Sequence, residues 1–228
     1  MIESIRDKSY FISKDDKDFG KREHSRKIDR ELGFNINAIE QKLINSAKAK
    51  CNGGQYFEWG PAIHDGAQTW VGLDFQTLQL TYSDLVTMIN NHELAKAQHV
   101  VDLGAAYGRL GIILSAMAPN VKFTGVEYVI ERVDEGNRIY QKLNLKNCTL
   151  QVGDLNSPLI ILPEADIYYL YDFGNDQQIN VLLRRLSELF EEKKFRLIVR
   201  GHMSKDLIKK NYQHFLYCLL YTSPSPRD

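Results

Sequence analysis

The stretch from His99 to Gly111, HVVDLGAAYGRLG, constrains the fold more than any other part of this 228-residue chain. An apolar run leads into Asp102 and Leu103, and three glycines follow in the spacing GxxxGxxG. Glycines allow a tight turn and let a ligand approach the backbone, and a helix that follows offers free N–H groups at its N-terminus. The pattern therefore predicts a strand, a ligand-binding turn and a helix.

Short apolar runs alternate with helical stretches after this motif. Strands are predicted at 99–103, 121–127, 148–152, 166–171 and 195–200, and helices at 108–118, 129–143 and 176–192. Such alternation implies right-handed crossovers that place helices on both faces of a parallel sheet. We therefore predict an α/β fold with a doubly wound, mostly parallel sheet.

The remaining sequence divides the chain into three parts. Residues 1–80 are predicted to be an N-terminal extension, made of a charged, solvated and partly disordered lead-in (1–30), a helix from about Ile28 to Lys48, and an aromatic, glycine-rich loop. The TYSD at 81–84 indicates a helix start with a Ser or Thr cap, and residues 81–215 form the main domain. The tail at 216–228 is expected to be non-native, so that the chain is C-terminally truncated; a native Ser/Pro tail is the alternative.

The charge balance and the cysteines exclude several classes of protein. The 29 basic and 29 acidic residues cancel, which disfavours a broad nucleic-acid footprint. Cys51, Cys148 and Cys218 are widely spaced and form no CxxC, so they are expected to be free thiols, and the histidines show no metal-ligand spacing. No apolar run approaches the ~18 residues of a membrane span. We expect a cytoplasmic protein with no membrane segment and no metal.

The residues of the turn discriminate among nucleotide ligands. The phosphate-loop pattern GxxxxGK[ST] is absent, and a dinucleotide-type GxGxxG would need glycine where Ala106 stands. Asp102, at the end of the first strand, would repel a pyrophosphate. A carboxylate there suits a ligand that carries an ammonium group and a sulfonium. Arg109 could itself meet an anion.

At these residues the sequence resembles the class I (Rossmann-like) S-adenosylmethionine-dependent methyltransferases, whose first motif reads roughly acid-x-Gly-x-Gly-x-Gly. The resemblance covers about residues 80–202 and departs from the motif at Ala106, which replaces the middle glycine. It implies S-adenosylmethionine as cofactor and methyl transfer as the reaction. It also implies a set of contacts: the methionine end at Asp102, Gly104, Ala106 and Gly108, the ribose hydroxyls at Glu127, the adenine amino group at Asp154, and the adenine ring at the backbone N–H of Leu155.

The methyl acceptor is much less legible. Asp172 and Phe173, in YLYDFGN, partly resemble the [ND]-P-P-[YF] motif of amino-group methyltransferases, but both prolines are missing. Asp172 could orient or deprotonate a nucleophile and Phe173 could pack on the sulfonium methyl; alternatively, Asp172 caps the helix that starts near Asp176. Arg200 and His202 end the fifth strand and could face the same cleft. The acceptor is expected to be a protein lysine or a small molecule.

Two other readings stay open, together with local alternatives for each acid. The chain could be an NAD-dependent oxidoreductase, or a non-catalytic module that binds a protein partner through residues 50–80. Asp102 could cap a turn, Glu127 could end a strand in solvent or cap a helix, and Asp154 could form an Asx turn. The aromatic segment is either a lid or core filling; it contains Tyr56, Phe57, Trp59 and Trp70, with Gly53, Gly54, Gly60 and Gly72 as flexible points.

Overall fold

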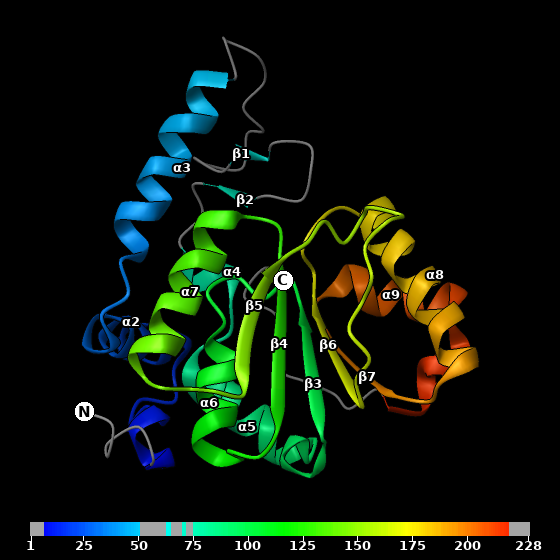
Figure 1. Ribbon diagram of the computed structural model, residues 1–228, viewed down its shortest axis with the longest axis horizontal. Helices are drawn as coiled ribbons and strands as arrows, with labels where there is room; N and C mark the ends of the chain where they lie inside the picture. Colours follow the sequence, from blue (N-terminus) through cyan, green and yellow to red (C-terminus); the bar gives the residue numbers. More distant parts are fainter. Residues whose placement is uncertain (1–6, 51–62, 65–69, 72–74, 219–228) are drawn as a thin grey trace.

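A computed structural model describes residues 7–50, 63–64, 70–71 and 75–218, and its centre is a five-stranded sheet (Figure 1). Every neighbouring pair in this sheet is parallel, in the order β5–β4–β3–β6–β7. The strands are β3 (His99–Leu103), β4 (Lys122–Glu127), β5 (Cys148–Val152), β6 (Ile167–Tyr171) and β7 (Arg196–Arg200). The predicted doubly wound sheet is confirmed, and each strand begins and ends within one residue of its predicted bounds. The direction of winding reverses between β3 and β6, which is where open α/β sheets bind ligands.

Helices cover both faces of the sheet (Figure 1). One face packs against α5 (Tyr82–Asn91), α6 (Arg109–Met117) and α7 (Ile130–Lys142), and the other against α8 (Asp176–Glu192) and α9 (His202–Asn211). Side chains alternate between the faces along each strand, so that Val100 and Tyr169 join the first core while Val101 and Leu103 join the second. The three predicted helices after the glycine turn are confirmed.

Capping residues fix where the helices begin and end. Thr81 caps α5 and accepts the Asp84 N–H at 3.2 Å, which confirms the helix start predicted from TYSD. Asn175 caps α8 in a reciprocal capping box with Gln178. The predicted helix from Ile28 to Lys48 is two helices, because Gly33 takes a left-handed φ of 86° and ends the first.

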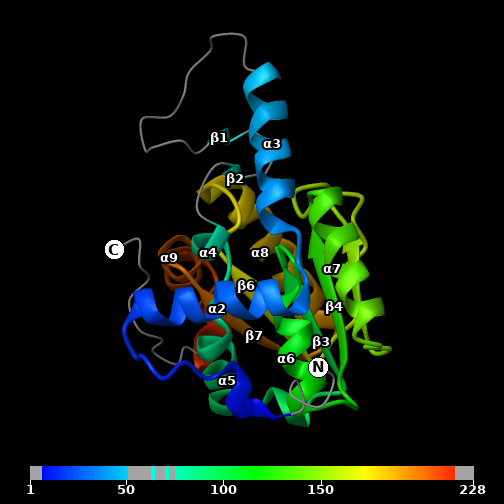
Figure 2. The ribbon, with the colours of Figure 1, turned by 90° about the vertical axis from the view of Figure 1, so that its left-hand side faces the viewer.

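The expectation of a solvated, partly disordered lead-in is wrong for the described part of residues 1–30. This part contains the short 3₁₀ helix η1 (Lys8–Phe11) and α2 (Asp18–Leu32), and α3 (Ile36–Lys50) follows. Phe11, Ile28 and Leu32 are fully buried in the same core as α5 and α6. Figure 2 shows α2 lying across these helices. Most charged side chains of α2 are exposed or half-buried, while Ile28 and Leu32 face the core together with the buried Asp29, so high charge density did not mean disorder.

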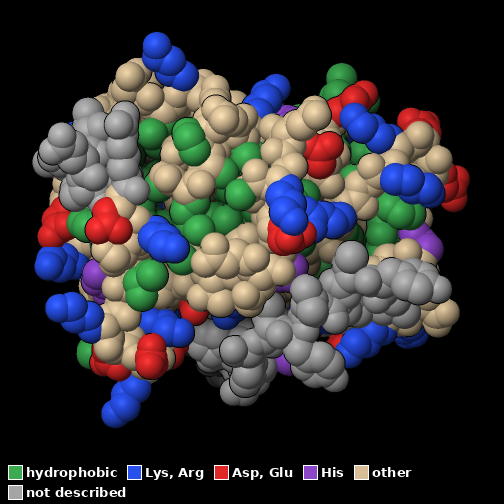
Figure 3. All heavy atoms as spheres, turned by 90° about the horizontal axis from the view of Figure 1, so that it is seen from below, with side chains coloured by type: hydrophobic (Ala, Val, Ile, Leu, Met, Phe, Trp, Pro, Cys, Tyr) green, Lys and Arg blue, Asp and Glu red, His purple; other side chains and the backbone are tan. Residues whose placement is uncertain are grey.

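The remaining described elements are small. They are the antiparallel pair β1 (Ile63–His64) and β2 (Trp70–Val71), α4 (Phe75–Leu78), η2 (Leu94–Lys96) and η3 (Gln213–Cys218). The predicted aromatic lid residues 56, 57 and 59, the flexible glycines at 53, 54, 60 and 72, and the tail from 219 lie outside the described residues. Within the described part of the chain, no helix is both long and apolar enough to span a membrane. On the face seen in Figure 3, basic and acidic side chains are interspersed rather than gathered by sign.

Candidate functional site

The turn after β3 is built on backbone conformations that favour glycine. Gly104 has φ +90° and Gly108 has φ +76°. A Cβ atom at Gly104 would lie 3.1 Å from the Cβ of Phe173, and one at Gly108 would overlap the hydroxyl of Tyr140. Ala106 also has a positive φ, of 48°, which costs a non-glycine residue about 1–2 kcal/mol. The backbone therefore holds the glycine-type turn even where the middle glycine is replaced.

Glu127 ties the end of β4 to this turn. Its Oε2 accepts the Ala106 N–H at 2.8 Å, and its Oε1 accepts the Val129 N–H at 2.9 Å. The side chain is buried, and two backbone donors hold its carboxylate in one orientation. A carboxylate has about four lone-pair positions, so these two bonds leave acceptor capacity on both oxygens.

Asp102 is a buried acid beside the turn. Asp102 is 6% exposed, and none of the described residues donates a hydrogen bond to its carboxylate. Burial, and to a lesser degree the negative charge of Glu127, raise the pKa of Asp102 to about 8. An unpaired buried carboxylate is costly to fold, and such groups concentrate at functional sites.

The third predicted acid lies at the end of the neighbouring strand. The Gly153 N–H donates to the Glu127 carbonyl at 2.9 Å, which holds the end of β5 against β4. Asp154 follows, half-buried, and its Oδ1 accepts the Asn156 N–H at 2.8 Å in the Asx turn considered from the sequence. Leu155 is buried in the second core. The structure thus brings Asp102, Glu127 and Asp154 to the carboxyl ends of three adjacent strands.

The acceptor-side residues are placed differently from the sequence expectation. The carboxylate of Asp172 accepts the N–H groups of Met203 at 3.1 Å and Ser204 at 3.0 Å, and also the Ser204 hydroxyl. Asp172 therefore caps α9, and the alternative that it caps α8 is wrong because Asn175 does so. These bonds favour a positioning role for Asp172. Phe173 does lie against the turn, over Gly104.

Arg200 ends β7 and His202 follows two residues later, and their side chains lie in different surroundings. Arg200 lies on the α5 face of the sheet, with its guanidinium carbon 5.9 Å from the ring centroid of Tyr171. His202 is exposed and begins α9, which packs against α8 on the opposite face. The structure therefore does not bring Arg200 and His202 into one cleft.

An N-terminal acid reaches the site from α3, which the sequence reasoning missed. Glu40 Oε1 accepts the Tyr107 hydroxyl at 2.7 Å and the Arg132 Nε–H at 2.9 Å, and its Oε2 accepts from Arg132 Nη2 at 3.1 Å. Arg132 Nη1 in turn lies 4.0 Å from Glu127 Oε1. All four groups are buried. The partners of Glu40 lie far away in sequence, so no local pattern could reveal them.

Arg109 forms a second buried ion pair, with Asp29 of α2. Its Nε donates to Asp29 Oδ1 at 3.2 Å, and its Nη2 also bonds the Asp29 carboxylate. Nη1 donates to the Leu80 carbonyl at 3.0 Å, and the guanidinium carbon lies 4.9 Å from the centroid of the Tyr82 ring. Arg109 is therefore buried against an acid of α2, and the structure does not place it to meet the anion of a ligand. This arginine attaches the N-terminal helix to the start of α6.

No group of three His, Cys, Asp or Glu side chains in the described ranges is placed to hold a metal ion. Of the three cysteines, Cys148 is described as a half-buried free thiol, and burial raises its pKa to about 11.

Comparisons with known proteins give one family match and several similar structures. Residues 94–199 match the family model described as "Methyltransferase domain". A comparison with curated proteins finds no match. Similar solved structures include human N-acetylserotonin methyltransferase in complex with SAM, at 23% identity and a TM-score of 0.41, over 47% of this chain and 30% of that one. An O-methyltransferase from a trans-AT PKS multienzyme of Brevibacillus brevis, in complex with S-adenosyl-L-homocysteine, is similar at 17% identity and a TM-score of 0.40, over 44% and 34%.

A third similar structure is precorrin-6y C5,15-methyltransferase from Geobacter metallireducens GS-15, at 19% identity and a TM-score of 0.46, over 61% of this chain and 71% of that one. The chain spans about a third of the length of the first two proteins. The family match covers the glycine turn, four whole strands of the sheet and all of β7 except Arg200. Residues 94–199 of this chain therefore match a methyltransferase domain and form the doubly wound, Rossmann-like sheet.

Proposed function

We propose that the protein transfers a methyl group from S-adenosylmethionine, which binds at the carboxyl ends of β3, β4 and β5. The buried carboxylate of Asp102 carries this proposal. It stands beside the glycine turn without a donor among the described residues, so a ligand that brings an ammonium group and a sulfonium would pair with it. A pyrophosphate would place more negative charge there, which argues against a dinucleotide.

The other residues fit the same donor. We assign the methionine end to Asp102 and to the turn made by Gly104, Ala106 and Gly108, whose positive φ values give the tight loop at the end of β3. Glu127 has acceptor capacity left for two ribose hydroxyls, in spite of its two backbone bonds.

We assign the adenine to Asp154 and to the backbone N–H of Leu155. Asp154 is half-buried, and its Asx turn with Asn156 fixes the loop at the end of β5. The hydrogen bond from the Gly153 N–H to the Glu127 carbonyl holds this segment beside Glu127. A single nucleoside could therefore reach both, with its ribose at Glu127 and its adenine at Asp154.

The chemistry needs positioning more than acid–base catalysis. When bound, the donor supplies a methyl group on a positively charged sulfur, which an acceptor nucleophile attacks in line as the sulfur–carbon bond breaks. Phe173 covers Gly104 and helps to exclude water from the turn, while Asp172 holds α9 at the end of β6. The acceptor is a small molecule or a protein lysine, and the balanced charge disfavours nucleic acid. We place the reaction in the cytoplasm.

Calorimetric titration tests the donor. S-adenosylmethionine and NADH are titrated separately into the wild-type chain, Asp102→Asn, and Asp134→Asn as the matched control on the exposed side of α7. We expect the first ligand alone to bind, and Asp102→Asn to lose about 1.5–3 kcal/mol of binding free energy, as for a hydrogen bond to a charged group. Binding of NADH, or of neither ligand by a folded protein, would overturn the proposal.

A further inference from the structure

A polar cavity lies between α5 and the strands β6 and β7. It has a volume of about 120 Å³ and is lined on one side by α5 and on the other by residues of the sheet, among them Tyr169 and Arg200. A cavity of about 10–15 Å³ is enough to hold one water, so this cavity has room for a small organic group. None of the residues assigned to the donor site lines it.

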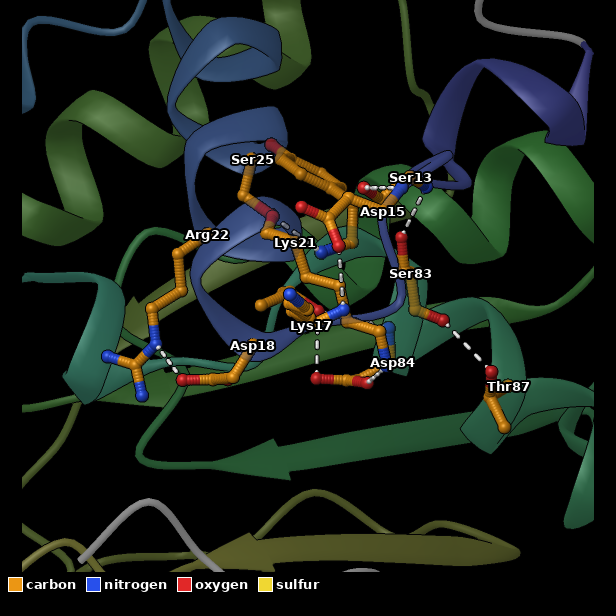
Figure 4. A network of polar contacts seen from close by, with 12 residues as sticks. Ser13, Asp15, Lys17, Asp18, Lys21, Arg22, Ser25, Ser83, Asp84 and Thr87 are labelled. Carbon is orange, nitrogen blue, oxygen red and sulfur yellow. Dashed lines mark hydrogen bonds and ion pairs between the residues drawn. The ribbon is translucent and has the colours of Figure 1, made fainter.

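The α5 wall of the cavity is already engaged in hydrogen bonds (Figure 4). Asp84 Oδ1 accepts from Lys21 Nζ at 3.2 Å, and its Oδ2 accepts the Thr81 hydroxyl at 2.8 Å. The Thr87 hydroxyl donates to the Ser83 carbonyl at 3.1 Å. These bonds bind the α5 wall to α2 and to itself. Asn91 and His92 also line the cavity from this side.

Two residues on the sheet side of the cavity carry buried donors that have no partner among the described residues. Tyr169 is 4% exposed, and its hydroxyl has no hydrogen-bond partner among the described residues. The same holds for the buried Nε–H of Arg200. Both side chains lie on the α5 face, because Tyr169 pairs in register with Ile198, and Arg200 is two residues further along the same strand.

These two donors determine the chemistry of the occupant. Burial raises the pKa of Tyr169, and the negative charge of Asp102 raises it further, so the phenol keeps its proton. The guanidinium of Arg200 is always charged and cannot accept a hydrogen bond. A phenol O–H and a guanidinium N–H at the same cavity call for a ligand with acceptor atoms and negative charge. Asp84 in the opposite wall disfavours a doubly charged anion such as phosphate.

We propose that this cavity binds the carboxylate of a small organic acid, through the Tyr169 hydroxyl and the Arg200 Nε–H. This assignment goes beyond the methyl donor and rests on the cavity alone. Tyr169 is the register partner of Asp102 on the neighbouring strand, so the bound acid lies on the β6–β7 side of the glycine turn. A small molecule held there would sit next to the proposed donor.

Nuclear magnetic resonance tests the site directly, because the Nε–H of an arginine gives its own nitrogen–proton correlation. Benzoate is titrated into the chain, and benzamide serves as the uncharged probe of the same shape. We expect benzoate to shift the Arg200 Nε–H and the Tyr169 backbone amide in one saturable process. Benzamide is expected to bind about 10-fold more weakly, since it lacks the charge.

Variants separate recognition from folding. Tyr169→Phe removes a buried hydroxyl with no protein partner, so the fold is retained, and benzoate is expected to bind about 5- to 10-fold more weakly. Arg200→Gln should weaken it by about 10-fold or more, and Arg184→Gln, on the exposed side of α8, is the matched control. If benzoate shifts neither resonance, binds no better than benzamide, or binds equally to Tyr169→Phe, the proposal is wrong. A melting curve for Tyr169→Phe that matches wild type confirms that the comparison is made on folded protein.

Discussion

Asp102 is expected to lower the free energy of unfolding of the ligand-free protein. Replacing Asp102 with Asn should recover that loss. The pKa of Asp102 rises from 3.8 to about 8 on folding, mainly because the carboxyl is buried. Between pH 5 and pH 7 the unfolded chain has therefore lost a proton that the folded chain keeps. A raised folded-state pKa means that stability is lost as pH rises, here across the window from about 4 to 8.

The size of the effect follows from the proton count. One proton is worth about 1.4 kcal/mol per pH unit, so the Asp102 contribution to the free energy of unfolding falls by about 2.7 kcal/mol from pH 5 to pH 7. Asn has nearly the same shape and does not titrate. The stability of Asp102→Asn relative to wild type should therefore increase by that amount over the same interval.

Urea unfolding, followed by circular dichroism at pH 5, 6 and 7, measures this difference. His92 and His99, whose pKa values are lowered chiefly by burial, also contribute to the pH dependence of stability, but both proteins share them and their contribution cancels. Asp134→Asn is the control and should show no pH-dependent difference from wild type. Parallel stability curves for wild type and Asp102→Asn would refute the reasoning, as would a variant that is less stable than wild type at pH 7.

Three further predictions concern buried groups outside the proposed donor contacts. Glu40→Gln removes the carboxylate that accepts two hydrogen bonds from Arg132. It should lower the free energy of unfolding in urea by about 2–4 kcal/mol and weaken donor binding in the same titration; unchanged values for both would contradict the network. Asp29→Ala should lower the free energy of unfolding by about 3–5 kcal/mol, because it leaves the Arg109 charge buried without its partner. The double variant Asp29→Leu, Arg109→Met should restore most of that loss in the same urea unfolding. A double variant as unstable as the single one would count against the ion pair. Cys148, in a chain whose other two cysteines are serine, should react with iodoacetamide at pH 8 about 100-fold more slowly than an unperturbed thiol, because its raised pKa leaves little thiolate; an equal rate would show that burial does not protect it.

The sequence by itself determined the sheet and the strand ends at which three acids lie. The strands are short apolar runs bounded by turn residues, and their order in the chain alternates with amphipathic helices, so local patterns were sufficient to predict them within a residue. Asp102, Glu127 and Asp154 could be grouped for the same reason. Parallel strands bring their carboxyl ends to one edge, so residues that end different strands must meet there.

Tertiary structure alone decided what depends on contacts between distant segments. The N-terminal helices looked like a solvated lead-in because charge density is a local property, while the burial of Phe11 and Ile28 depends on a partner surface made by α5 and α6. The same separation hid Glu40, which meets Arg132 across 92 positions of sequence. It also hid the use of Asp172 as a cap for α9. Whether a buried polar group finds a partner is settled only when all the packed elements are in place, and for this reason the cavity at Tyr169 was invisible in the sequence.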